Sequence, residues 1–308
     1  MLTSRFTPHD TFSSYGEAVQ SNEGFLHLAA AGNDEAGLAA RARKVRDIGM
    51  DEVAKLNQKG WDRRVEEQDV WTRPVSMEDV DRARRGEWTV ILTPTKPVPR
   101  AWFGDVTERD ILCLASGGGQ QGPILAAAGA RVTVFDASPK QLAQDEMVAS
   151  RDGLILTTRL GLMHDLSCFA DASFDLIFHP ASNCFAPDIE PVWQECFRTL
   201  RPGGALLVGF MNPDVYIFDK TAEERGEFIV RFPLPYADLT DLPPDELQRL
   251  IERDHIVEFS HSLEDQIGGQ LKAGFVLTDF FEDRWDGMPE PGISRYMPTL
   301  FATRATKP

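Results

Sequence analysis

The sequence predicts an α/β fold in which a doubly wound, mostly parallel sheet carries helices on both faces. Short apolar runs alternate with helix-like segments from about residue 110 to residue 210. This alternation is typical of parallel strands, which need crossover connections between them. A glycine-rich turn follows the first apolar run, and an acid ends the second. These two features indicate the nucleotide-binding form of the architecture.

Seven strands are expected, five in a core and two near the C-terminus. The core strands are expected at residues 110–114, 131–135, 153–157, 174–179 and 204–210, with helices at 122–129, 138–149 and 187–200. After Pro213 an acidic, proline-bearing stretch interrupts the pattern, and a short helix begins at Pro244. A helix over 262–273 ends at Gly274 and precedes strands at 275–281 and 299–304.

The N-terminal third of the chain divides into two segments. Residues 1–30 have few periodic apolar positions and are expected to be loosely ordered. Residues 31–104 are expected to form a helical extension that covers the core as a lid. Its helices are expected from Asn33 or Asp34 to about Asn57, from Trp61 to Trp71, and from a capping box at Ser76 to Arg85, before an extended segment at 88–92. Trp61, Trp71, Trp88 and Trp102 are expected to pack this extension onto the core, with one or two of them forming an aromatic wall.

Length and composition fit a protein with a complete buried core. The chain has 308 residues and 42% apolar content, enough for one large or two small domains. It contains no secretory signal and no run of about 18 apolar residues, so no membrane span is expected. Four cysteines without Cys-x-x-Cys spacing indicate free thiols, and therefore a cytoplasmic protein.

The charge of the chain argues against a nucleic-acid substrate. There are 48 acidic and 32 basic side chains, with a net charge of −16. Proteins that bind nucleic acids usually present a basic patch, whereas the arginines at 41–46 and 82–85 are interleaved with acids or alanines. A small-molecule substrate is therefore favoured. No cluster of His, Cys and Asp has metal-ligand spacing, so no metal is expected.

The segment from Ile111 to Asp136 predicts a ribose-binding site. Three consecutive glycines, at 117–119, allow a tight turn and bring the main chain close to a ligand. Asp136 follows Gly117 by 19 residues, at the expected carboxyl end of the second strand. Its two oxygens can there accept hydrogen bonds from both ribose hydroxyls.

With these features the chain resembles the class I S-adenosylmethionine (SAM)-dependent methyltransferases. The resemblance rests on the glycine turn, on Asp171–Phe178 around the fourth strand, and on a Leu-x-Pro-Gly-Gly turn within Cys196–Val208. The closest likeness is to the quinone-biosynthesis branch. The resemblance implies SAM as the cofactor, an antiparallel last strand in a seven-stranded sheet, and a SAM-binding domain at residues 105–308.

The resemblance also implies which residues contact the cofactor. The methionine part is expected against Ala115, Ser116, Gly117 and Gly119, the ribose against Asp136 and Ala137, and adenine against Asp165 or the backbone near Met163 and His164. The chain departs from the family at three positions: Cys113 and Leu162 stand where acids are common, and Ala115 replaces the first glycine.

The catalytic residues are harder to place, because methyl transfer mainly needs an aligned nucleophile and the exclusion of water. The resemblance places the loop after the fourth strand beside the transferable methyl group. His179 is a candidate base there, and Asn183 a candidate to orient the substrate or the methionine moiety; alternatively, they cap the strand and shape the turn. Tyr216, after the fifth strand, is a candidate substrate contact.

The leading hypothesis is a SAM-dependent methyltransferase that acts on a small molecule. A nicotinamide-dependent oxidoreductase is an alternative, disfavoured by the missing Gly-x-Gly-x-x-Gly register and the absence of a Tyr-x-x-x-Lys proton donor. A non-catalytic SAM-binding or partner-binding module is a second alternative, which the three departures keep open. The sequence indicates neither the acceptor atom nor the oligomeric state.

Overall fold

The structure is a computed structural model that describes residues 37, 49–254, 256–285 and 292–308. The chain divides into two compact units, residues 1–39 and 40–308, and the second unit contains the sheet. The segment expected to be loosely ordered, residues 1–30, lies outside the described residues. The helix start expected at Asn33 or Asp34 lies outside them too.

Seven strands form one sheet in the order β3-β2-β1-β4-β5-β7-β6. The strands are β1 (Asp110–Leu114), β2 (Arg131–Asp136), β3 (Leu156–Leu160), β4 (Phe174–His179), β5 (Leu200–Met211), β6 (Val276–Asp283) and β7 (Leu300–Thr306). Neighbours among β1 to β5 pair in parallel, whereas β7 pairs antiparallel with both β5 and β6. The predicted doubly wound sheet with an antiparallel last strand is confirmed.

Successive side chains of the central strands point to opposite faces of the sheet, and this divides the core into two layers. In β1, Ile111 and Cys113 face one layer and Leu112 and Leu114 face the other, and all four side chains are fully buried. Burial on both faces explains why this strand is a continuous apolar run in the sequence. The first layer is covered by α4 (Gln121–Ala127) and the second by α6 (Glu190–Thr199), while α5 (Pro139–Asp152) packs beside β2 and β3.

Several elements differ from the expected boundaries; among them, β5 begins at Leu200, four residues earlier than expected. β3 begins at Leu156, three residues later than expected, because α5 continues to Asp152 and Gly153 ends that helix in the left-handed region (φ 63°). In the extension, α2 (Met50–Glu66) is one continuous helix where two helices were expected. Gly60 in its middle is buried, and an internal glycine is tolerated where packing needs a small residue. By contrast, α3 (Met77–Arg84) begins at the expected Ser76 capping box.

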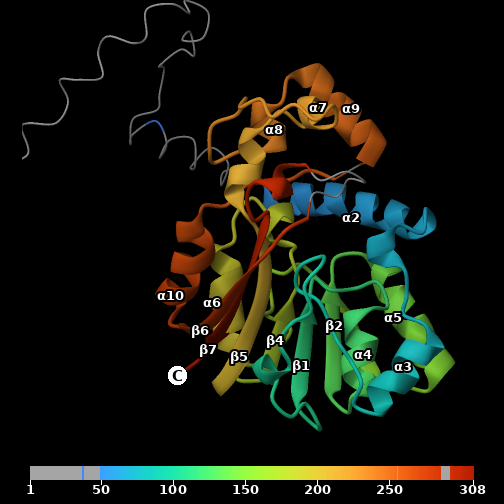
Figure 1. The fold of residues 1–308 in the computed structure, drawn as a ribbon. Helices are drawn as coiled ribbons and strands as arrows, with labels where there is room; N and C mark the ends of the chain where they lie inside the picture. Colours follow the sequence, from blue (N-terminus) through green and yellow to red (C-terminus); the bar gives the residue numbers. More distant parts are fainter. Residues whose placement is uncertain (1–36, 38–48, 255, 286–291) are drawn as a thin grey trace, which may run out of the picture. The chain divides into compact units, whose positions relative to one another are not determined.

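Further helices lie beyond the carboxyl ends of the parallel strands. Figure 1 shows α2 crossing this end of the sheet, with α7 (Lys220–Glu223), α8 (Asp238–Asp241) and α9 (Pro244–Asp254) beyond it. One π-helical turn (Glu264–Gly268) and α10 (Gly269–Ala273) lead back to β6. Short 3₁₀ turns occur at Val70–Thr72, Arg100–Trp102, Asn183–Phe185, Pro213–Ile217 and Ile293–Arg295.

Asn57 attaches α2 to two distant segments of the chain. Its buried amide Nδ2 donates to the carbonyl oxygens of Phe185 and Val257, each at 3.1 Å. Its Oδ1 accepts a hydrogen bond from the Val257 N–H at 2.8 Å. Further along α2, the Asp62 carboxylate accepts the hydroxyl of Ser138 at 2.6 Å. The helix is therefore held at both α5 and the loop after β4.

Asp145 lies fully buried beneath the glycine turn. Its Oδ2 accepts the Gly118 N–H at 3.0 Å, and its Oδ1 has no hydrogen-bond partner among the described residues. Burial raises the pKa of this carboxyl to about 8, and the neighbouring Asp136 adds to the shift. The folded protein therefore holds Asp145 largely protonated below that pH.

Replacing Asn57 with alanine should lower the free energy of unfolding by about 2–3 kcal/mol, because three backbone groups lose their partner. Urea denaturation measures this change. Lys55→Ala, at an exposed position of the same helix, is the control and should change the free energy by less than about 0.5 kcal/mol. Equal effects of the two substitutions would contradict the role of Asn57 in attaching α2.

Replacing Asp145 with asparagine should alter how stability depends on pH. Because the folded-state pKa lies above the ordinary value of 3.8, the folded protein binds the proton more tightly than the unfolded chain. The wild type should therefore lose stability as pH rises from about 4 to about 8, by up to about 1.4 kcal/mol per pH unit from this group. Denaturation curves across this range should show a flatter profile for Asp145→Asn. Parallel profiles would show that Asp145 titrates normally.

Candidate functional site

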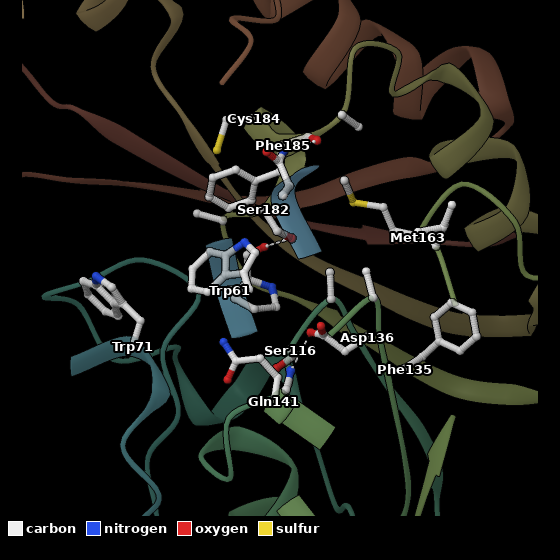
Figure 2. Close-up of a pocket in the computed structure, with 18 of the residues that line it drawn as sticks. Trp61, Trp71, Ser116, Phe135, Asp136, Gln141, Met163, Ser182, Cys184 and Phe185 are labelled. Carbon is white, nitrogen blue, oxygen red and sulfur yellow. Dashed lines mark hydrogen bonds between the residues drawn. The ribbon is translucent and has the colours of Figure 1, made fainter. Parts of the chain in front are cut away.

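A cavity of about 390 Å³ lies between the carboxyl ends of the parallel strands and α2. The turns after β1 and β2 form its floor, and the loop after β4 forms one wall. Figure 2 shows side chains of these segments directed toward a common space, with Asp136 and Ser116 on one side and Cys184 and Phe185 on another. Open α/β sheets bind their ligands at this edge.

The turn after β1 brings the main chain to the cavity floor. Gly118 (φ 113°) and Gly119 (φ 71°) adopt left-handed conformations that favour glycine. At Gly117 a Cβ atom would lie 3.2 Å from the carboxylate of Asp136, and still closer to α5. Ala115 has a positive φ of 47°, a strained conformation for alanine, and lines the cavity.

Asp136 lies at the carboxyl end of β2, as predicted, and lines the cavity together with Ala137. The Gly117 N–H donates to Oδ2 and the Ser138 N–H donates to Oδ1, both at 2.9 Å. Burial raises the pKa of this carboxyl, the backbone donors oppose the shift, and nearby Asp62 adds to it. Each carboxylate oxygen has more than one acceptor position, so Asp136 can also accept hydrogen bonds from a ligand.

Two buried polar side chains on the cavity floor lack a partner. Ser116 Oγ and Gln141 Oε1 form no hydrogen bond with the described residues, and both residues line the cavity. An unpaired buried polar atom costs about 1–3 kcal/mol, so such atoms fit a site that receives polar ligand groups. Ser116 was predicted, whereas Gln141 was not. Gln141 could have been found from its position in the first turn of the helix that follows Asp136.

The loop after β3 contributes part of the predicted set. Met163 and His164 line the cavity, and burial lowers the pKa of the His164 imidazole. Asp165 is exposed and does not line it; its carboxylate accepts the Ser167 N–H at 3.0 Å. Gly119 packs against the backbone of α5 instead of the cavity. The geometry therefore does not support the contacts expected of Asp165 and Gly119.

His179 and Asn183 are buried beneath the loop after β4 and do not line the cavity. His179 Nδ1 donates to the carbonyl oxygen of Leu114 at 2.9 Å, and Nε2 lies 2.8 Å from the Asn183 amide. The Asn183 amide also bonds to Gln266 at 2.8 Å, and burial lowers the pKa of His179. The expected catalytic and substrate contacts therefore lack geometric support, because the polar atoms are engaged within the protein. The arrangement favours a structural role in holding this loop.

Tyr216 is buried behind the cavity wall rather than at its surface. Its hydroxyl donates to Glu258 Oε2 at 3.0 Å, and Glu258 does line the cavity. Sequence reasoning missed Glu258 because it lies in a segment without a recognisable motif. Tertiary contacts bring it to the site: the Phe259 N–H donates to the Cys184 carbonyl oxygen at 2.8 Å.

Aromatic rings line part of the cavity. Trp61 packs edge to face on Phe185, with ring centroids 5.3 Å apart, and Trp71 packs in the same way on Trp285 at 5.2 Å. The expected aromatic wall is confirmed for two tryptophans of the extension. The other two, at positions 88 and 102, are buried in the core.

Within the part of the chain that the structure describes, no three His, Cys, Asp or Glu side chains are grouped to bind a metal ion. No helix in the described ranges is long and apolar enough to cross a membrane. The four cysteines are free thiols, and Cys168 is exposed.

Comparison with known proteins identifies the family. The methyltransferase domain family matches residues 112–208. The uncharacterized methyltransferase YbaJ of Bacillus subtilis is 47% identical over 258 residues, which is 84% of this chain and 100% of that protein. A ubiquinone biosynthesis O-methyltransferase of Xylella fastidiosa is 29% identical over 121 residues, but this chain spans only 49% of that enzyme.

A solved structure shares the fold. The crystal structure of a SAM-dependent methyltransferase from Mesorhizobium loti is similar with a TM-score of 0.53 at 18% identity, over 67% of this chain and 94% of that one. None of these findings favours the nicotinamide-dependent alternative. Together, the relative that matches over its whole length, the matching domain family and the sheet topology show that the chain belongs to the class I SAM-dependent methyltransferases, with SAM as its cofactor.

Proposed function

We propose that the chain transfers the methyl group of SAM to a small-molecule acceptor held in the cavity beneath α2. The observation that carries the proposal is the aromatic-lined part of the cavity beside the loop after β4. Pockets of a few hundred Å³ with mostly apolar walls are typical of small-molecule sites. The net charge of −16 supports this acceptor class over nucleic acid. The free thiols support a cytoplasmic location.

The residues on the cavity floor fit SAM. Asp136 offers carboxylate oxygens to the ribose hydroxyls, and the turn at Gly117 leaves no side chain between the main chain and the cofactor. Ser116 and Gln141 offer unpaired polar atoms to the polar groups of SAM. The loop at Met163 borders the adenine end. When bound, SAM supplies an electrophilic methyl group on a sulfonium.

The task of the protein is then to align the acceptor and to exclude water. Trp61 on α2 and Phe185 in the loop after β4 meet edge to face and can hold a flat molecule. Asn57 keeps these two segments together. Holding the nucleophile in line with the breaking bond supplies much of the rate enhancement in such a displacement, because the reaction becomes effectively intramolecular.

Replacing Asp136 with alanine should weaken SAM binding about 10- to 150-fold, equivalent to about 1.5–3 kcal/mol for hydrogen bonds to a charged group. Calorimetric titration with SAM measures the affinity. Asp165→Ala is the matched control, because that carboxylate is exposed and outside the cavity, and its affinity should stay within threefold of the wild type. Unchanged binding by Asp136→Ala would rule out the ribose contact.

The acceptor class can be tested by supplying methyl-labelled SAM and the purified protein to a cell extract. The extract is first separated into a fraction below about 1 kDa, nucleic acids and proteins. Label should enter the small-molecule fraction, since the aromatic part of the cavity is covered by α2. Asp136→Ala should lose the labelling. Transfer of label to RNA, DNA or protein alone would overturn the proposal while leaving methyltransferase activity intact.

A further inference from the structure

Glu258 and Asp136 are the two carboxylate side chains among the described residues that line the cavity. Asp136 ends β2, whereas Glu258 contacts Tyr216, which follows β5. In the sheet, β5 is three strands away from β2, and neighbouring strands lie about 4.8 Å apart, so these strands are separated by about 14 Å. Asp136 therefore lies on the β2 side of the cavity, and Glu258 contacts the segment that follows β5.

The main chain on both sides of Glu258 is held firmly. Its N–H donates to Asp238 Oδ2 at 2.7 Å, and its carbonyl oxygen accepts the Asp238 N–H at 3.1 Å. The preceding residue is bound by Asn57, and the following residue is bound to Cys184. These contacts fix the position from which the Glu258 side chain enters the cavity.

The two oxygens of Glu258 differ in their surroundings. Oε2 accepts the Tyr216 hydroxyl at 3.0 Å and lies 3.6 Å from Lys220 Nζ. Glu258 raises the pKa of Lys220, and burial together with Glu258 raises that of Tyr216, so both groups remain protonated beside Oε2. Oε1 accepts no hydrogen bond from the described residues. One side of this carboxylate is therefore held by the protein, and the other is open to a ligand.

The neighbouring side chains are mostly apolar. Trp61, Phe185 and Met211 line the cavity with Glu258, and the first two rings pack edge to face. Besides Tyr216 and Lys220, Glu258 has Asp238 and Cys184 as titratable neighbours. Burial raises the pKa of the Asp238 carboxyl, and it raises that of the Cys184 thiol well above the ordinary range. The thiol is thus protonated and unsuited to accept a proton. The Glu258 side chain is 30% exposed, so Oε1 can accept a hydrogen bond from a ligand that enters the cavity.

We propose that Glu258 Oε1 binds the hydroxyl group of a flat aromatic acceptor and takes its proton during methyl transfer. The acceptor oxygen forms a bond to the methyl carbon, and the sulfur–carbon bond breaks with its electron pair left on sulfur. The hydroxyl proton passes to the Glu258 carboxylate. Tyr216 and Lys220 act as positioning residues through Oε2. This inference rests on the proposed function and specifies the chemistry of its acceptor.

Binding is tested with 2-naphthol, which carries one hydroxyl, and 2-methoxynaphthalene, which lacks that proton. The full chain is first saturated with S-adenosylhomocysteine, the demethylated product of SAM, and calorimetry measures both affinities. The wild type should prefer 2-naphthol at least tenfold. Glu258→Gln should reduce the preference below threefold, because charge-assisted hydrogen bonds are about twice as strong as neutral ones. Glu87→Gln, at an exposed position outside the cavity, should keep the wild-type preference.

A second variant keeps this test decisive. Glu258→Leu removes every acceptor atom, so a hydroxyl preference that survives in both variants would overturn the inference. A wild type that binds neither probe, or binds both equally, would overturn it as well. S-adenosylhomocysteine affinity, measured on the same samples, reports on the cofactor site: intact affinity shows a folded variant, and its absence in the wild type would count against the proposed function itself.

Proton transfer is tested with SAM by comparing 2-naphthol with naphthalene-2-thiol at pH 8. The thiol reacts largely as its thiolate and needs no base, whereas the naphthol must lose a proton. Glu258→Gln should lower methylation of the naphthol at least 30-fold and that of the thiol less than threefold, as measured by mass spectrometry of the products. Equal losses with the two acceptors, or a wild type that methylates neither, would overturn proton transfer to Glu258.

Discussion

The hydrogen bonds of Asn57 join three parts of the chain that are far apart in the sequence. They connect α2 with Phe185 and Val257, which lie 128 and 200 residues further along. On the same helix, Asp62 binds the hydroxyl of Ser138, and the Ser138 N–H binds Asp136. One helix is therefore attached near both Asp136 and the opposite wall. Any displacement of α2 must alter both parts of the cavity together.

This attachment matters because methyl transfer in the cavity requires that α2 cover it and exclude water. The aromatic contact between Trp61 and Phe185 spans from α2 to the loop after β4, and Asn57 joins the same two segments. Excluding water from this region strengthens the electrostatic interactions of Glu258 and prevents competing reactions. Helix α2 thus contributes to the cavity, in the same compact unit as the sheet.

The sequence placed the cavity lining around Asp136 better than the lining around Glu258, and the reason is local geometry. Gly117 and Asp136 lie in one strand–turn–helix–strand unit, whose form follows from neighbouring residues. Glu258 reaches the cavity through contacts with Asp238 and Cys184, and no local pattern encodes such long-range contacts. For the same reason, the sequence predicted a helical extension that covers the core, but it did not predict the individual contacts of α2.

His179 shows that the role assigned to the last residue of a strand depends on the direction in which its side chain points. The strand boundary was predicted at His179, and the structure keeps this residue in β4, paired with Val208. Its side chain is consequently held within the fold and bonded to Leu114, instead of entering the loop beside the cavity. Sequence proximity to a functional loop did not determine the direction of the side chain.

One of the three departures from the family pattern, Cys113, also acquires a physical explanation at the glycine turn. Cys113 stands where an acid is common, and burial together with nearby Asp145 raises the pKa of its thiol. Asp145 places a carboxylate under the turn from α5, where it accepts the Gly118 N–H. An acid at position 113 would put a second carboxyl group in the same buried region, where burial disfavours its charged form. Cys113 is therefore compatible with an intact cofactor turn, and it is not by itself a sign of lost catalysis.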